Sequence, residues 1–146
     1  MRPIVLWGRY FRCAAAGCSG SKGMTVIYTI GYQRLDPLQL IGLLHEHGVS
    51  LLLDVRSRPY SRFKGFNKKA LAATVEEAGI GYQWAGERLG GFSEIREAAI
   101  AGLAETARGN TVCLMCMEAD PDKCHRKTEI ARRLTDYDVS VHHIAT

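Results

Sequence analysis

Apolar and polar positions along the chain form five short apolar runs that are separated by longer segments with helical spacing. Short apolar runs predict strands, and apolar residues three or four positions apart predict amphipathic helices. The predicted strands are Val26 to Ile30, Val49 to Val55, Ile80 to Trp84, Val112 to Met117 and Val139 to Ile144. The alternation predicts an α/β fold: a single three-layer, Rossmann-like domain with a mostly parallel sheet of about five strands and helices on both faces.

Capping residues and glycines predict where the helices begin and end. Asp36 and Pro37 provide an N-cap and a proline suited to the first helical position, and Gly48 ends that helix. The second predicted helix begins at Asn67 and ends at Gly79, and the third begins at Ser93, contains Ile95 and ends at Gly109. The fourth is capped by Asp120 and runs from about Pro121 to Thr135, which places Cys124 about one turn into it.

The basic residues are unevenly distributed along the 146 residues, whose net charge is +4. Residues 1–23 contain four basic residues and no acidic one, which leaves 15 of each from Met24 onward. Because the body of the chain is neutral, only a local patch could bind nucleic acid. Since the first strand opens at Met24, we expect residues 1–23 to be a disordered or mis-assigned extension and residues 24–146 to form the domain.

Composition also bears on the location of the protein. No apolar run approaches the roughly 20 residues of a membrane span, so we expect no membrane partner. Five cysteines are an odd number without the regular spacing of a disulfide scaffold. This favours free thiols in a reducing compartment, and we therefore expect a cytoplasmic protein.

Residues whose side chains could bind a ligand or take part in a reaction lie where the predicted strands end. The carboxyl ends of parallel strands share one edge of the sheet, and ligands bind outside that edge. The residues at these ends are Tyr32, Asp54, Arg56, Cys116 and Glu118. A carboxylate within an apolar strand is costly without a fixed partner, so Asp54 either anchors an arginine or the substrate, or caps a neighbouring loop.

A basic and aromatic segment follows the second strand. Guanidinium groups suit phosphate oxygens and aromatic rings suit nucleic-acid bases, so the segment predicts anion binding, with a solvated basic loop as the alternative. It holds six basic residues and no acidic one among residues 56–69: Arg56, Arg58, Arg62, Lys64, Lys68 and Lys69, interleaved with the aromatic residues Tyr60, Phe63 and Phe66. We also predict Ser61 in this segment, and Tyr32 at the end of the first strand, as ligands of the substrate or anion. Its length and its Gly65 suggest a lid over the site.

The segment TVCLMCMEADPDKCHR, residues 111–126, combines a strand with a cluster of reactive side chains. We predict Cys116 or Cys124 as a nucleophile or redox thiol, Glu118 or His125 as acid and base, and Arg126 as an anion ligand. A helix N-terminus and a neighbouring cation would lower the pKa of a thiol and raise its reactivity. The alternative is two buried thiols that pack as small apolar groups.

A zinc site made of Cys113, Cys116, Cys124 and His125 is a further interpretation. Residues three positions apart in a strand point to opposite faces, so Cys113 and Cys116 do not suit a shared metal, and Cys113 is expected in the core. We predict no metal and no cofactor.

Four separated motifs resemble a known family. They are a TIG opening, a DVR-x-x-P-x-S segment, an LGG turn and a C-x-E…P-x-x-CHR block, and in that order they resemble the bacterial and archaeal domain of unknown function 488 family. The resemblance implies a shared fold and site from Met24 onward, but no reaction. Its signature positions here are Gly31, Asp54, Arg56, Pro59, Ser61, Leu89, Gly90, Gly91, Cys116, Glu118, Cys124, His125 and Arg126. Tyr32 stands where many members have histidine.

Two functions from different classes fit these residues. The first is a small enzyme that acts on an anionic substrate carrying a nucleotide or phosphate, with Arg56 and Arg126 as anion ligands. A variant is sulfur transfer, because the DVR strand resembles that of rhodaneses, although their C-x-x-G-x-R loop is absent. The second is a nucleic-acid-binding module whose affinity falls steeply with salt.

Overall fold

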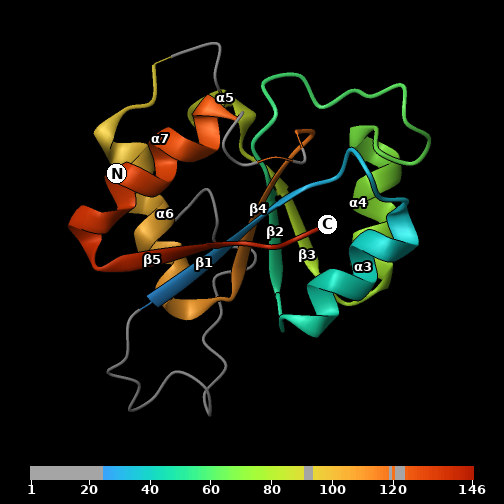
Figure 1. The fold of residues 1–146 in the computed structure, drawn as a ribbon, viewed down its shortest axis with the longest axis horizontal. Coiled ribbons are helices and arrows are strands. Elements are labelled where there is room, and N and C mark those ends of the chain that lie inside the picture. Colours follow the sequence, from blue (N-terminus) through green and yellow to red (C-terminus); the bar gives the residue numbers. More distant parts are fainter. Residues whose placement is uncertain (1–24, 91–93, 119, 121–123) are drawn as a thin grey trace.

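The computed structural model describes residues 25–90, 94–118, 120 and 124–146, and at residues 125–128 it describes the backbone alone. The expectation for residues 1–23 lies outside this part of the chain. Five parallel strands form one sheet in the order β3-β2-β4-β1-β5, which confirms the predicted α/β fold (Figure 1). The strands are β1 (Thr25–Gly31), β2 (Leu51–Asp54), β3 (Gly81–Trp84), β4 (Val112–Cys116) and β5 (Val139–His143).

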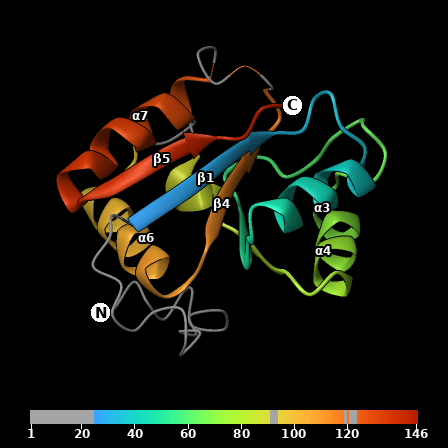
Figure 2. The ribbon, with the colours of Figure 1, turned by 60° about the horizontal axis from the view of Figure 1, so that its bottom comes forward.

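Helices cover both faces of the sheet, as predicted. The longer helices are α3 (Pro37–Glu46), α4 (Lys68–Glu77), α6 (Glu97–Gly109) and α7 (His125–Leu134). A short helix α5 (Gly86–Leu89) follows β3, and a 3₁₀ turn (Thr135–Tyr137) follows α7. Helices α3 and α4 pack on one face, and α6 and α7 pack on the other (Figures 1 and 2).

Alternation along the strands separates two apolar cores. In β4, Leu114 and Cys116 face α6 and α7, whereas Cys113 and Met115 face α3 and α4. The prediction that Cys113 and Cys116 point to opposite faces is therefore confirmed, and Cys113 is a buried core residue. Because both faces of β4 are buried, its whole length is apolar, as is typical of a central parallel strand.

The order of the strands defines where the connections diverge. Strand β4 lies between β2 and β1. The chain leaves β1 and β2 over the face covered by α3 and α4, but it leaves β4 over the face covered by α7. Ligands of such sheets bind at the point where the connections diverge. That point is the carboxyl end of β4.

The first helix begins as its sequence predicts. Asp36 is the N-cap, and its Oδ1 accepts a hydrogen bond from the backbone N of Gln39 at 2.8 Å, while Gln39 Oε1 accepts one from the N of Asp36 at 2.9 Å. Two of the N–H groups that a helix start leaves without a helical partner are satisfied in this way. Gly48 follows the helix with a φ of +69°, a conformation that glycine adopts without strain.

Two predicted helix starts are wrong. Helix α7 begins at His125, and Cys124, in an extended conformation, is its N-cap rather than a residue one turn inside it. The backbone N of Asp120 instead donates to Glu118 Oε1 at 3.1 Å, so Asp120 belongs to the bend after β4. Pro121 and Ser93 lie outside the described residues.

Helix α6 begins at Glu97 with Arg96 as its N-cap, so Ile95 precedes the helix. The carbonyl of Ile95 accepts a hydrogen bond from Arg133 Nη1 at 2.7 Å, which ties this position to α7. The side chain of Ile95 is nevertheless buried in the same core as Ala99 and Leu103.

Candidate functional site

The residues predicted at the strand ends form two clusters on opposite faces of the sheet. Asp54 lies in register with Met115, on the face covered by α3 and α4. Cys116 lies one residue further along β4, and its side chain therefore points to the face covered by α6 and α7. The structure thus divides the single predicted site into a charged cluster (Asp54, Arg56, Tyr82 and Tyr32) and a thiol pair (Cys116 and Cys124).

The charged cluster is built on a bidentate ion pair. Arg56 Nε donates to Asp54 Oδ1 at 2.8 Å and Arg56 Nη2 donates to Oδ2 at 2.6 Å. The backbone N of Arg56 also donates to Oδ1, at 3.1 Å. Asp54 is fully buried and Arg56 is 5% exposed. Fork-to-fork geometry of this kind offsets part of the cost of removing both charges from water. Both interpretations of Asp54 hold, because its carboxylate anchors an arginine and caps the start of a loop.

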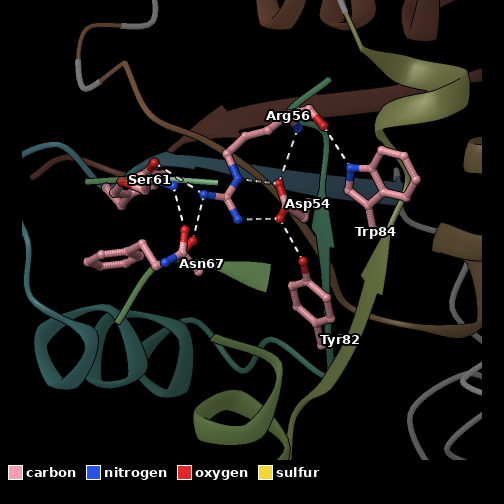
Figure 3. A network of polar contacts seen from close by, with 8 residues as sticks. Asp54, Arg56, Ser61, Asn67, Tyr82 and Trp84 are labelled. Atoms are coloured by element: carbon pink, nitrogen blue, oxygen red, sulfur yellow. Dashed lines mark hydrogen bonds and ion pairs between the residues drawn. The ribbon is translucent and has the colours of Figure 1, made fainter. Parts of the chain in front are cut away.

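Tyr82 completes this pair, and sequence analysis did not single it out. Its hydroxyl donates to Asp54 Oδ2 at 2.6 Å (Figure 3). Burial, followed by the charge of Asp54 and the hydrogen bond to it, raises the pKa of Tyr82 above its ordinary value. Burial alone would lower the pKa of Arg56, but the hydrogen bond and charge of Asp54 raise it above the ordinary value. The alternation of side chains along β3 could have indicated that Tyr82 faces the same side of the sheet as Asp54. That inference also requires knowing that β2 and β3 are neighbours in the sheet, which the sequence pattern does not show.

Arg56 also holds the end of the basic segment. Its Nη1 donates to the carbonyl of Phe66 at 2.7 Å and to the hydroxyl oxygen of Tyr32 at 3.2 Å. The rings of Tyr32 and Phe66 are stacked, with centroids 4.2 Å apart. Four side-chain hydrogen bonds of Arg56 are thus made inside the protein. Arg56 is a loop anchor, and the anion-binding role predicted for it and for Tyr32 stays a prediction.

The loop between Arg56 and Phe66 is tied by its own hydrogen bonds. The N of Ser61 donates to Asn67 Oδ1 at 2.7 Å (Figure 3). Ser61 Oγ accepts a hydrogen bond from the N of Phe63 at 3.0 Å. Asn67 is the N-cap residue of α4, which confirms the predicted start of that helix, but its side chain makes no hydrogen bond to the helix. Ser61, predicted to bind an anion, shapes the loop. The basic residues that the loop exposes are Arg58, Arg62 and Lys64, and Tyr60 beside them is 75% exposed.

Two glycines let α5 press against the start of this loop. A Cβ on Gly86 would lie 1.8 Å from the carbonyl oxygen of Arg56, and a Cβ on Gly90 would lie 2.3 Å from Ser57 Oγ. Trp84 Nε1 donates to the same Arg56 carbonyl at 2.7 Å. The contact explains Gly90 of the LGG turn, because only glycine allows such a close backbone approach.

The thiol pair lies at the carboxyl end of β4. The Sγ atoms of Cys116 and Cys124 are 3.3 Å apart, and neither cysteine is part of a disulfide. Cys116 ends the strand and is fully buried, while Cys124 is the N-cap of α7 and is 4% exposed. The backbone of Cys116 is fixed to β1, since its carbonyl accepts from the N of Tyr32 at 3.1 Å.

The remaining predicted residues lie on either side of this pair. Glu118 is half-buried, and its carboxylate accepts from the N of Asp120, which stabilises the bend after β4. His125 and Arg126 open α7, but their side chains lie outside the described residues, and their predicted roles stay predictions. Among the side chains that the structure describes, no group of three or more His, Cys, Asp or Glu could hold a metal ion. No helix within the described part of the chain is long and apolar enough to cross a membrane.

The fold and site define a parallel α/β domain with a thiol pair where its connections diverge. A family model described as "Domain of unknown function DUF488" matches residues 37–100 and 93–132, and the chain belongs to this family. The resemblance inferred from the four motifs is thereby confirmed. Comparison with curated proteins gives no match, and comparison with solved structures gives none either.

Proposed function

We propose that this protein is a small enzyme that uses a thiol at the carboxyl end of β4 on an anionic substrate carrying a phosphate or nucleotide. The observation that carries the proposal is the 3.3 Å contact between Cys116 Sγ and Cys124 Sγ where the connections of the sheet diverge. Two nucleophilic groups in contact at the position where α/β sheets bind ligands favour chemistry over simple packing.

The N-cap position of Cys124 supports a reactive thiol. The first backbone N–H groups of α7, a helix of ten residues, stabilise negative charge close to this residue. The same groups attract an anionic substrate. Cys124 would then act as the nucleophile, with Cys116 as its neighbour and Glu118 or His125 as acid and base.

Positive charge for binding an anion comes from two places in this proposal. Arg126, the second residue of α7, would contact the anion beside the thiols. Arg58 and Arg62 are exposed on the basic loop and would attract it from solvent. Arg56 plays an indirect part, because it holds the loop that presents the other two.

Protection of a thiol by an anion tests the proposal. We expect inorganic phosphate or adenosine monophosphate to slow the alkylation of Cys124 by iodoacetamide, a neutral reagent, as measured by peptide mass spectrometry. Arg126→Ala should raise the half-protecting concentration roughly 10- to 150-fold, the equivalent of one charge-assisted hydrogen bond.

Arg132→Ala is the matched control, because Arg132 is exposed near the other end of the same helix. It should leave the protection unchanged. If neither anion alters the rate, or if both variants behave alike, the anionic substrate is ruled out.

The exposed loop supports nucleic-acid binding as a second candidate. Tyr60 is largely exposed and lies in the same loop as the exposed Arg58, Arg62 and Lys64, a combination of residue types that can stack on bases and pair with phosphates. Binding of a single-stranded oligonucleotide should then fall steeply as salt rises and should be lost in Tyr60→Ala. The control is Leu38→Ala, which removes an exposed apolar side chain outside the loop and should leave binding unchanged. Tyr137→Ala is unsuitable as a control, because the Tyr137 hydroxyl donates a hydrogen bond to Glu97.

Sulfur transfer is the narrower variant of the enzyme. A thiosulfate-to-cyanide assay tests it, with activity in the wild type and loss in Cys124→Ser as the expected result. Absence of thiocyanate in the wild type would exclude the variant and leave the anion-protection experiment unaffected.

A further inference from the structure

We propose that Cys116 and Cys124 form a reversible dithiol–disulfide couple that exchanges with low-molecular-weight disulfides. The inference goes beyond the proposed function, since it needs no anionic substrate. It starts from the 3.3 Å between the two Sγ atoms. A disulfide bond is about 2.05 Å long, so the sulfurs need to approach by little more than 1 Å.

The elements that carry the two thiols permit this approach. Cys116 is held in the sheet by the hydrogen bond from Tyr32, but Cys124 is an N-cap outside the helical ladder of α7. The two cysteines are eight positions apart in the sequence. A short connection keeps the thiols at high effective concentration in the folded protein, which favours an intramolecular disulfide over a mixed one.

Position in the fold assigns different roles to the two sulfurs. Cys124 keeps 4% of its surface exposed, whereas Cys116 has none. Both residues are buried, so in the proposed couple we assign first contact with an external disulfide to Cys124 because of its N-cap position, where the first N–H groups of α7 favour a thiolate. Cys116 lies beneath it and is placed to resolve the mixed disulfide.

The reaction balances in two exchanges. The Cys124 thiolate attacks one sulfur of an external disulfide, which forms a mixed disulfide and releases one small thiolate. Cys116 then loses its proton and attacks Cys124 Sγ, which forms the protein disulfide and releases the second thiolate. Two protein thiols are oxidised, one external disulfide is reduced to two thiols, and an excess of small thiol reverses both steps.

Cys113 provides an internal control. It is as buried as Cys116 and lies three residues before it, but it belongs to the core on the opposite face of the sheet. Proximity in the sequence alone would give Cys113 the same chance of pairing with Cys124. The geometry of the sheet excludes it.

The experiment is oxidation by glutathione disulfide, with alkylation of the remaining thiols and peptide mass spectrometry. Cys13→Ser and Cys18→Ser are introduced first, so that only Cys113, Cys116 and Cys124 contribute. We expect one product that has lost two hydrogen atoms, with the bond mapped to Cys116–Cys124 and fully reversed by dithiothreitol. In Cys116→Ser we expect a persistent glutathione adduct on Cys124, and Cys113→Ala should behave like the parent.

Three results would overturn the couple: a parent protein that stays reduced, a bond that includes Cys113, or a parent that accumulates the same adduct as Cys116→Ser. The parent alone decides the first two, so the test holds even if a variant does not fold. Failure here is distinguishable from failure of the proposed function, because phosphate protection of Cys124 against iodoacetamide does not require a disulfide.

Discussion

The charged cluster and the thiol pair occupy the same edge of the sheet but differ in how their polar groups are satisfied. Asp54 accepts four hydrogen bonds, three from Arg56 and one from Tyr82. The thiol pair instead brings two nucleophilic sulfurs into contact at the end of β4. A closed network of opposite charges fixes a structure, whereas we propose that the adjacent nucleophiles take part in a reaction. In this proposal, unusual residues at the ends of parallel strands serve two purposes, which the two faces of the sheet separate.

Removing the arginine should produce the largest loss of stability. Arg56→Ala leaves the carboxylate of Asp54 buried without its cation and releases the carbonyl of Phe66. Breaking a buried pair on one side costs about 3–5 kcal/mol, which urea unfolding would measure. Arg62→Ala, on the exposed part of the loop, should stay within about 0.5 kcal/mol. Equal effects of the two substitutions would contradict a structural role for the charged cluster.

Tyr82→Phe should produce the second-largest loss of stability. It removes a hydrogen bond to a charged acceptor and should cost about 1.5–3 kcal/mol at neutral pH. Because the folded protein raises the pKa of Tyr82, the unfolded chain loses this proton first, at a pH of about 10. The contribution of Tyr82 is therefore complete below that pH and is lost as the pH rises above it. Urea midpoints between pH 7 and 11 should fall less steeply in Tyr82→Phe, and identical slopes would refute this assignment.

A pair of glycine substitutions should give effects of opposite sign. Gly86→Ala places a Cβ against the Arg56 carbonyl and Trp84 Nε1, so overpacking should cost about 1–3 kcal/mol. Gly42→Ala lies within α3 with nothing close to the added atom, and it should stabilise the protein by about 0.5–1 kcal/mol. Thermal unfolding of the two variants checks this. Stabilisation by Gly86→Ala would mean that α5 does not press on the loop.

Substitution in the thiol pair should destabilise the protein less than substitution in the charged cluster. Cys124→Ser keeps a donor of similar size at an N-cap, where serine is favourable, and should cost no more than about 0.5–1.5 kcal/mol. The same change should abolish the disulfide. A loss as large as that of Arg56→Ala would show that the thiols, too, are mainly structural.

The sequence predicted the five strands, the two helix layers and the opposite faces of Cys113 and Cys116, because each depends on local periodicity. It did not predict that Asp54 and Cys116 face opposite sides. The face on which each side chain lies depends on the register of β2 against β4, and these two strands are far apart in the sequence. Tyr82 was missed for the same reason, since its partner Asp54 lies on a neighbouring strand.

Local rules also failed where two signals competed. Asp120 and Pro121 have the residue types of a helix start, yet the N of Asp120 bonds Glu118 and the helix begins at His125. Asn67 occupies the predicted N-cap position of α4, but its side chain accepts a hydrogen bond from the N of Ser61 in the loop instead of from the helix. In both places, a hydrogen bond within a bend or loop involves the polar group that the sequence pattern assigned to a helix cap.

Native-state alkylation tests most directly whether the chemistry belongs to the thiol pair. Iodoacetamide labelling of the folded protein, followed over time by peptide mass spectrometry, compares Cys124 with Cys113, which likewise forms no disulfide but lies in the opposite core. We predict that Cys124 is labelled first, while Cys113 is labelled only as the protein unfolds. Labelling of Cys124 and Cys113 at the same rate, that of global unfolding, would contradict a reactive centre at the end of β4.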